Sequence, residues 1–197
     1  MQPGATRVFL DANILYSRTL RDWFCLLSQE SGLDGIALFW SEDVWAEVIY
    51  HLRKANPHHS DAQVGGWRRR LLEGFPDAMV TNYVIDPQFL AGDPCDAHVI
   101  AAAQKGAVDY MVTSNIKDFA TLADILDFEI YDPDSFLCLI AERRPAATYA
   151  TTKRQLKYWK MKAGAKELPK ALSDAGAPQF AGKVKTILQQ IALRADY

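Results

Sequence analysis

Short apolar runs alternate with segments in which apolar residues recur at helical spacing. Residues 8–10 (Val-Phe-Leu) and 36–40 (Ile-Ala-Leu-Phe-Trp) have the length and composition of buried strands. Between them, Leu20, Trp23 and Leu27 recur every three to four positions, which is typical of one face of a helix. The first forty residues therefore predict a strand, a loop, a helix and a second strand.

The same alternation continues toward the carboxyl terminus. Ser41 is a typical N-cap, and Glu42 and Asp43 follow in the first turn, where the helix dipole favours anions, so a helix is predicted over residues 42–54. Asp93 and Pro94 predict a helix start for an alanine-rich helix that ends near residue 105. The remaining expectations are a helix at about 61–73, an apolar segment at 78–84, strands at 108–113 and 128–131, and helices at about 118–126 and 133–143.

Strands that alternate with helices are typical of a parallel sheet covered on both faces. We therefore expect an α/β fold, a three-layer α/β/α domain with a central parallel sheet, over residues 1–144. Residues 144–147 are interpreted as a linker, and residues 145–197 as a helical subdomain divided by prolines and a glycine.

The distribution of charge supports this division. Residues 1–144 contain 12 Lys and Arg against 21 Asp and Glu, whereas residues 145–197 contain 10 against 3. An acidic body with a basic tail suggests a polyanionic or an acidic partner. Charge alone does not decide between them.

Composition narrows the class of protein further. The 197 residues are 49% hydrophobic, yet no apolar run has the length of a membrane span, and the first residues lack the pattern of a signal peptide. Cys25, Cys95 and Cys138 form no C-x-x-C pair, so they are interpreted as reduced thiols. We expect a soluble, cytoplasmic protein.

Acidic residues occur where the predicted strands end. Asp11 directly follows the first strand, Glu47 lies at the edge of the apolar face of the helix 42–54, and Asp96 falls in the first turn of the alanine-rich helix. Because ligands of open parallel sheets bind at the carboxyl ends of the strands, we expect these three carboxylates to converge. Such a cluster needs a cation at neutral pH, since each carboxylate raises the pKa of its neighbours.

Each residue also has a structural explanation. Asp11 can cap a turn, Glu47 can be a solvated glutamate beside the core, and Asp93 is expected to be structural. Asn115 and Asp118 compete for a fourth position after the strand 108–113, although Asp118 can instead cap the helix that follows. His98 is left out because its helical angle turns it away from the two aspartates near it in sequence.

Four segments occur in the order seen in PIN domains, and the chain resembles the VapC-type toxins of bacterial type II toxin-antitoxin pairs over roughly residues 6–135. These segments are Val-Phe-Leu-Asp11-Ala-Asn13-Ile-Leu, Val-Trp-Ala-Glu47-Val, Asp93-Pro-Cys-Asp96-Ala-His-Val-Ile-Ala-Ala-Ala and Val-Thr-Ser-Asn115-Ile-Lys-Asp118-Phe. The resemblance implies an endoribonuclease that uses Mg²⁺ or Mn²⁺.

The resemblance also implies roles for single residues. Asp11, Glu47 and Asp96 match the acidic metal site, and Asn13 matches the polar residue that orients it. Many members have an aspartate where Asn115 stands, so either Asn115 binds through its carbonyl or a water, or Asp118 substitutes. The family further implies a homodimer and an antitoxin whose arginine enters the acidic cleft.

The basic tail is the second candidate for contact with nucleic acid. Lys153, Arg154 and Lys157 alternate with Tyr158 and Trp159, a composition suited to phosphate contact and base stacking. The alternative is an amphipathic helix that packs on the body. Asn13 and Ser114 are expected to contact substrate from the carboxylate side, whereas the run at residues 68–70 (Arg-Arg-Arg) is interpreted as a solvated face.

The predicted function is hydrolysis of RNA, transfer or ribosomal, by water activated at a carboxylate-bound metal. A phosphatase with an aspartate nucleophile is disfavoured, because Asn13 stands where a second aspartate would be needed. Two alternatives remain open: a noncatalytic module that binds RNA or an antitoxin, and a housekeeping nuclease that processes RNA.

Overall fold

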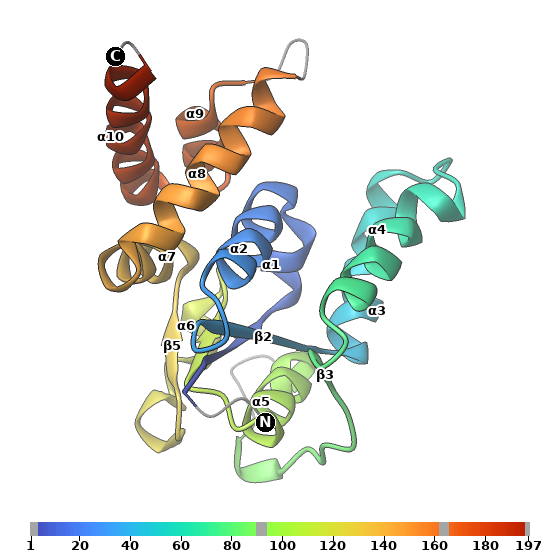
Figure 1. The fold of residues 1–197 in the computed structure, drawn as a ribbon. Helices are drawn as coiled ribbons and strands as arrows, with labels where there is room; N and C mark the ends of the chain where they lie inside the picture. Colours follow the sequence, from blue (N-terminus) through green and yellow to red (C-terminus); the bar gives the residue numbers. More distant parts are fainter. Residues whose placement is uncertain (1–3, 90–93, 162–165, 196–197) are drawn as a thin grey trace.

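The computed structural model describes residues 4–89, 94–161 and 166–195 (Figure 1). Its strands are β1 (Thr6–Leu10), β2 (Ile36–Ser41), β3 (Met79–Val80), β4 (Tyr110–Val112) and β5 (Glu129–Tyr131). They form one five-stranded sheet in the order β3-β2-β1-β4-β5, and every neighbouring pair is parallel. The predicted α/β class with a parallel sheet is confirmed.

Helices connect the strands and cover the sheet. The α-helices are α1 (Ala12–Tyr16), α2 (Arg18–Glu30), α3 (Glu42–Ala55), α4 (Asp61–Gly74), α5 (Ala97–Lys105), α6 (Ile116–Phe119), α7 (Pro133–Arg143), α8 (Pro145–Lys160), α9 (Leu168–Asp174) and α10 (Pro178–Ala195). Three single turns of 3-10 helix are η1 (Pro87–Phe89), η2 (Pro94–Asp96) and η3 (Ala123–Ile125). Figure 1 shows α1 and α2 on one face of the sheet and α5 on the other, an arrangement consistent with three layers.

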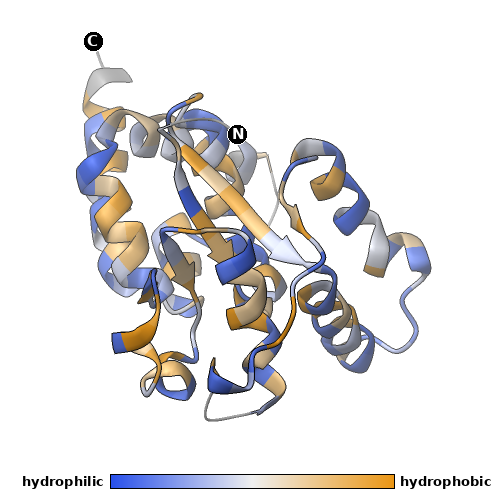
Figure 2. Ribbon diagram, turned by 90° about the horizontal axis from the view of Figure 1, so that it is seen from below, coloured by the Kyte–Doolittle hydropathy of each residue, from blue (hydrophilic) through white to orange (hydrophobic). Residues whose placement is uncertain are grey.

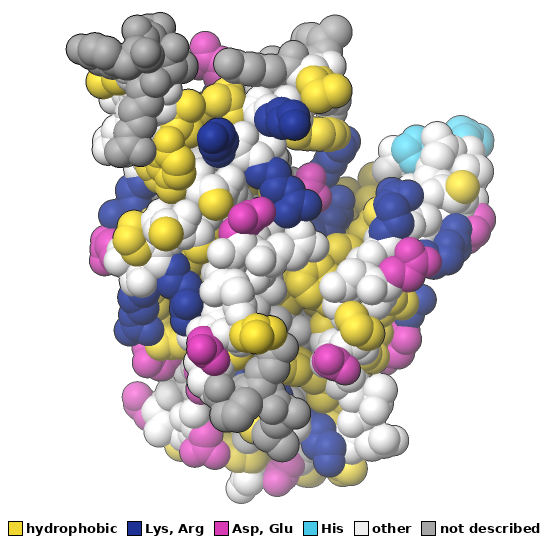
Figure 3. All heavy atoms as spheres, in the orientation of Figure 1, with side chains coloured by type: hydrophobic (Ala, Val, Ile, Leu, Met, Phe, Trp, Pro, Cys, Tyr) yellow, Lys and Arg dark blue, Asp and Glu magenta, His cyan; other side chains and the backbone are white. Residues whose placement is uncertain are grey.

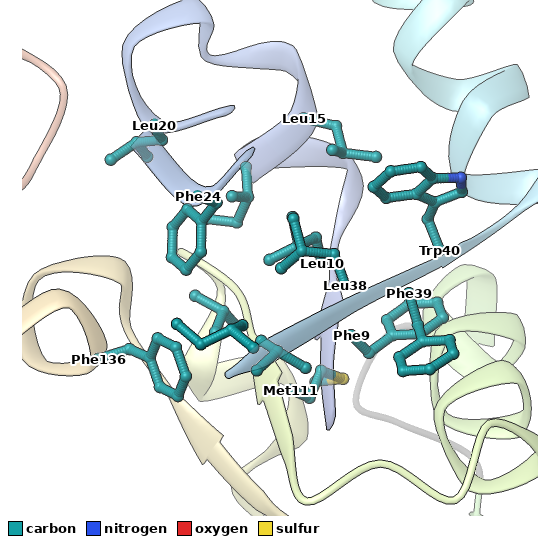
Figure 4. Packing of buried hydrophobic residues seen from close by; sticks show 14 of the residues in the cluster. Phe9, Leu10, Leu15, Leu20, Phe24, Leu38, Phe39, Trp40, Met111 and Phe136 are labelled. Carbon is teal, nitrogen blue, oxygen red and sulfur yellow. The ribbon is translucent and has the colours of Figure 1, made fainter. Parts of the chain in front are cut away.

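The core explains why the central strands are mostly apolar. Side chains alternate between the two faces of a strand, and both faces of the central strands are covered. Residues 8–10 of β1 and 38–41 of β2 are therefore buried in succession, whereas the edge strand β5 is more exposed. Figure 4 shows Leu10 and Leu38 directed toward the helix that carries Phe24, whereas Phe9 and Phe39 point to the other face. Figure 2 shows hydrophobic residues along the central strands and alternating hydrophobic and hydrophilic residues along the helices.

Capping residues set the helix starts that the sequence predicts. Ser41 accepts a hydrogen bond from the backbone N–H of Val44, and α3 begins at Glu42 as expected. A capping box of Ser60 and Gln63 starts α4, whose range matches the predicted helix. In the first predicted helix, Ser17 caps α2 and thereby separates it from α1.

Three predicted segments differ in the structure. The segment 78–84 contributes only the two residues of β3, and the expected helix at 118–126 is divided into α6 and η3. The prediction of a linker at 144–147 is wrong, because Pro145 occupies the first turn of α8 and Arg144 alone separates α8 from α7. Proline lacks an N–H that the first helical turn would leave unpaired, so it starts this helix without cost.

The C-terminal helices share the core of the sheet domain. Leu172, Phe180 and Val184 belong to the same buried cluster as β1, and the rings of Phe180 and Trp23 lie 4.9 Å apart. The buried carboxylate of Asp134 on α7 accepts hydrogen bonds from the backbone N–H groups of Gln179 (3.0 Å) and Phe180 (2.8 Å). In the described part of the chain, no helix is long and apolar enough to cross a membrane.

Candidate carboxylate site

Asp11 stands where the direction of strand addition changes. The chain passes from β1 to β2 and β3 on one side and then crosses to β4 on the other side of β1. Such a switch point leaves a crevice at the carboxyl ends of the two central strands. The backbone N–H of Asp11 donates to the carbonyl of Val112 at 3.1 Å, so Asp11 lies between the ends of β1 and β4.

Three hydrogen bonds hold the side chain of Asp11, which is only 6% exposed. Its Oδ1 accepts from the backbone N–H of Ala12 at 2.6 Å, which makes it the N-cap of α1 as well. Its Oδ2 accepts from Nδ2 of Asn13 and from the hydroxyl of Thr113, each at 2.6 Å. Both oxygens are therefore oriented by neighbours on two strand ends.

Thr113 and Asn13 extend this network to the loop after β4. The fully buried Thr113 hydroxyl also accepts from Nδ2 of Asn13 at 3.1 Å and from the backbone N–H of Asn115 at 3.0 Å. Oδ1 of Asn13 accepts from the backbone N–H of Ser114 at 3.0 Å. Thr113 was not among the residues predicted from the sequence, although its place directly after a predicted strand is a signal that could have found it.

Burial dominates the electrostatics of Asp11. It raises the pKa of the carboxyl above its ordinary value, while the hydrogen bonds from Thr113, Ala12 and Asn13 lower it. An electrostatic interaction with His98 also lowers it. A carboxylate whose desolvation outweighs its hydrogen bonds binds either a proton or a cation.

Glu47 on α3 is the second carboxylate of the site. Its side chain is 42% exposed, and its Oε1 lies 3.7 Å from Nε2 of His51. Burial raises the pKa of Glu47, and the negative charge of Asp11 raises it further, whereas His98 and His51 lower it. Asp11 and Glu47 are thus close enough for the charge of one to act on the other.

His98 faces this pair from α5. An electrostatic interaction with His98 lowers the pKa of both carboxyl groups, and Nδ1 of His98 is buried without a hydrogen-bond partner among the described residues. The sequence spacing predicted that His98 faces away from Asp93 and Asp96, and it did not predict that His98 approaches Asp11. Only the packing of α5 on the sheet brings it there.

Asp96 does not form a group of three potential metal ligands with Asp11 and Glu47. It ends η2 at the N-cap position of α5 and is half-buried, and its carboxylate makes no capping hydrogen bond. Within residues 4–89, 94–161 and 166–195, no three His, Cys, Asp or Glu side chains form a group that could hold a metal. The predicted N-cap Asp93 lies outside the described residues.

Asn115 and Asp118 lie on the loop and helix after β4. Asn115 occupies the N-cap position of α6 and is exposed, while the half-buried Asp118 lies within the first turn. Asp118 therefore does not cap this helix, which begins two residues earlier than predicted. Which of the two completes the site stays open.

The donors present fit a hard divalent cation. Asp11 and Glu47 supply carboxylate oxygens, and Mg²⁺ is commonly held in proteins by one or two carboxylates with water in its other positions. Burial is the main cause of the raised pKa of both groups, and a bound cation would offset its effect.

The basic residues predicted on the tail lie on α8. Lys153, Arg154 and Lys157 are exposed, and Nη1 of Arg154 lies 3.1 Å from Oε1 of Glu30 on α2. Trp159 packs partly buried against the core, while Tyr158 remains 47% exposed. The helix thus packs on the body through one face and presents cations and a tyrosine on another.

In comparisons with known proteins, no family model, no curated protein and no solved structure matches this chain. Its function is therefore inferred from the site.

Proposed function

We propose that the chain is a metal-dependent endoribonuclease with a PIN-like α/β/α fold. The observation that carries the proposal is the pair of carboxyl groups on Asp11 and Glu47, whose pKa values are both raised at the carboxyl end of the sheet. Asp11 is buried and oriented on both oxygens, which is the preorganisation that a metal ligand needs.

Asp11 and Glu47 would hold Mg²⁺ or Mn²⁺. The resemblance implies Asp96, at the start of α5, as a further ligand, although the described residues contain no group of three metal ligands. A bound ion of this type lowers the pKa of a water and offsets charge on phosphoryl oxygens. Thr113 and Asn13 keep the carboxylate of Asp11 directed into the crevice. Asn115 or Asp118, with Ser114, faces the substrate from the loop after β4.

The cellular role follows from the resemblance to VapC-type toxins. We propose that the protein acts in the cytoplasm as a homodimer on transfer or ribosomal RNA, and that an antitoxin inhibits it by placing an arginine against the carboxylates. A housekeeping nuclease would have the same site without the antitoxin.

The second candidate is a noncatalytic module that binds RNA or an antitoxin through the same crevice. Asn115 favours it, because this position holds an amide where an aspartate would give a fourth carboxylate. The absence of a group of three metal ligands in the described residues points the same way.

Cleavage assays separate the two candidates. Purified protein with Mg²⁺ or Mn²⁺ is expected to cut structured RNA, and sequencing of the new ends identifies the site. Asp11→Asn and Glu47→Gln should each lower the rate at least about 100-fold, since removal of a group that stabilises charge in a transition state costs this much.

The matched control is Glu73→Gln on the exposed side of α4, which should cut at the wild-type rate. Cleavage that persists in Asp11→Asn, or that does not depend on the metal, contradicts the proposal. Binding of RNA without any cleavage supports the noncatalytic module.

A further inference from the structure

A groove of about 730 Å³ lies between α2, α4 and α8, and neither Asp11 nor Glu47 lines it. Helix α2 contributes Arg18 and Arg21, α4 contributes Trp67 and Arg70, and α8 contributes Arg154 and Tyr158. In Figure 3, Lys and Arg side chains flank the hollow between the C-terminal helices and α4. The size of the groove is that of a site for a ligand of drug or nucleotide dimensions.

Positive charge is concentrated in this groove. Four arginines line it against one aspartate, Asp22, although the whole chain has a net charge of -2. Clefts lined by one sign of charge raise the local concentration of oppositely charged ligands. The groove therefore selects an anion.

Arg21 fixes the walls of the groove relative to each other. Its side chain is buried, its Nη1 donates to the carbonyl of Leu15 at 2.7 Å, and its guanidinium lies 4.2 Å from the ring centroid of Trp67 on α4. This contact joins α2 to α4 by a cation–π interaction. Arg21 is thus a positioning residue, and the ligand meets the other arginines.

The other three arginines of the groove have side chains that are partly exposed to solvent, so their N–H groups can reach a ligand. The side chains of Arg18 and Arg154 are 61% and 52% exposed, although each contacts the opposite wall: Arg18 donates to the hydroxyl of Tyr158, and Arg154 pairs with Glu30. Arg70 is exposed, and within the described part of the chain its guanidinium forms no hydrogen bond or ion pair. It is the cation with most capacity to bind a phosphate.

Two exposed aromatic rings accompany these cations. Tyr16 is 41% exposed and Tyr158 is 47% exposed, and both line the groove. Arginines beside exposed aromatic rings are typical of surfaces that bind unpaired nucleic acid, because phosphates meet the cations and bases stack on the rings.

The groove leads toward the carboxylate pair through Tyr16. The ring of Tyr16 meets that of His51 at 6.2 Å between centroids, and His51 lies 3.7 Å from Glu47. Tyr16 also ends the short helix α1 that Asp11 begins, so the two regions are one helix length apart. A chain-like ligand can occupy both.

We propose that this groove binds a single-stranded phosphodiester segment, with Arg18, Arg70 and Arg154 at its phosphates and Tyr16 and Tyr158 at its bases. The identity of that strand as the RNA substrate rests on the proposed ribonuclease function. An acidic peptide would use the same arginines but would leave the exposed rings without a stacking partner, and a free nucleotide would use one part of the groove only.

Fluorescence anisotropy tests the proposal without cleavage. The probe is a labelled single-stranded RNA of mixed sequence and about 12 nucleotides, a length that single-strand-binding domains cover, titrated in EDTA with the full chain. Arg70→Ala and Arg18→Ala are expected to weaken binding about fivefold each and to reduce the salt slope by about 0.7 for each phosphate that is no longer neutralised.

Arg69→Ala is the matched control, because Arg69 neighbours Arg70 on α4 but pairs with Asp61 outside the groove. It should leave the Kd within about twofold of wild type. Equal weakening in Arg69→Ala and Arg70→Ala overturns the proposal, as does a duplex RNA that binds as tightly as the single strand.

Substitutions of Tyr158 separate stacking from positioning. Tyr158→Ala should weaken binding about fivefold or more. Tyr158→Phe keeps the ring, loses the hydroxyl that accepts from Arg18, and should bind within about twofold of wild type. If the two variants weaken binding equally, the ring does not stack on a base.

Competition identifies the occupant. A polyglutamate peptide that displaces the probe as well as unlabelled RNA makes the groove a peptide site, and a mononucleotide that binds as tightly as the probe makes it a nucleotide pocket; either result overturns the proposal. If RNA binding depends on Arg70 but the protein has no nuclease activity, the groove is supported and the proposed function is refuted. If the protein cleaves RNA but binding does not depend on Arg70, the proposed function is supported and the groove is refuted.

Discussion

The hydroxyl of Thr113 donates a hydrogen bond of 2.6 Å to Oδ2 of Asp11, and this contact joins the ends of β4 and β1. The two residues are 102 positions apart in the chain. Because both are buried, the bond lies in a medium of low dielectric constant, where removal of a donor is costly.

We expect Thr113→Val to destabilise the fold by about 1.5–3 kcal/mol, the usual cost of removing a hydrogen bond to a charged group. Valine has nearly the shape of threonine, so the change tests the hydroxyl rather than the packing. Urea denaturation measures the loss, and Thr113→Ser should restore most of it. Equal stability of the serine and valine variants would show that the hydroxyl has no role.

The buried carboxyl of Asp11 predicts the pH dependence of the metal-free protein. Its pKa is raised above the unfolded value of 3.8, so between these two values the folded state binds a proton that the unfolded state has released. The stability contribution of this group is therefore complete below pH 3.8 and declines as the pH rises through the folded pKa.

Thermal melts between acidic and neutral pH measure this contribution as the difference between wild type and Asp11→Asn, which has no titrating group. Added Mg²⁺ or Mn²⁺ should raise the Tm of the wild type at neutral pH and leave that of Asp11→Asn unchanged, since binding to the folded state alone stabilises it. A metal effect of the same size in both proteins would place the ion elsewhere.

Asp134 predicts how firmly the last helices are attached. Asp134→Ala removes the acceptor for the N–H groups of Gln179 and Phe180 at the start of α10 and is expected to cost about 2–3 kcal/mol. Asp174→Ala, which removes exposed ion pairs with Lys166 and Lys170, should destabilise the fold much less, because solvent screens exposed ion pairs. Denaturation midpoints compare the two, and a larger loss for Asp174→Ala would contradict the structure.

The cysteines predict a pattern of alkylation. Burial raises the pKa of Cys25 to about 12, so its thiolate is scarce at neutral pH, whereas Cys95 is exposed. Iodoacetamide in the folded protein should modify Cys95 first and leave Cys25 intact until the protein is denatured. Mass spectrometry of the digested protein locates the label, and early modification of Cys25 would show that α2 opens.

The sequence by itself determined the order of the elements and the residues that cap them. Apolar runs at β1 and β2 and the cap at Ser41 were recognisable because strand burial and helix starts depend on neighbours in the chain. The place of Asp11 after β1 also followed, since a parallel sheet gathers the ends of its strands at one edge. The break at Ser17 and the short β3 were harder to foresee, because both depend on what packs around them.

Only the tertiary structure decided which distant residues contact Asp11 and Glu47 and which helices line the groove. The approach of His98 to Asp11 and Glu47 requires α5 to pack against the sheet, and the bond from Thr113 requires β4 to lie beside β1. No local sequence pattern encodes either contact. The arginine groove likewise joins residues from α2, α4 and α8. The physical reason is that local sequence sets backbone preference and burial, whereas contacts between distant residues depend on how whole elements pack.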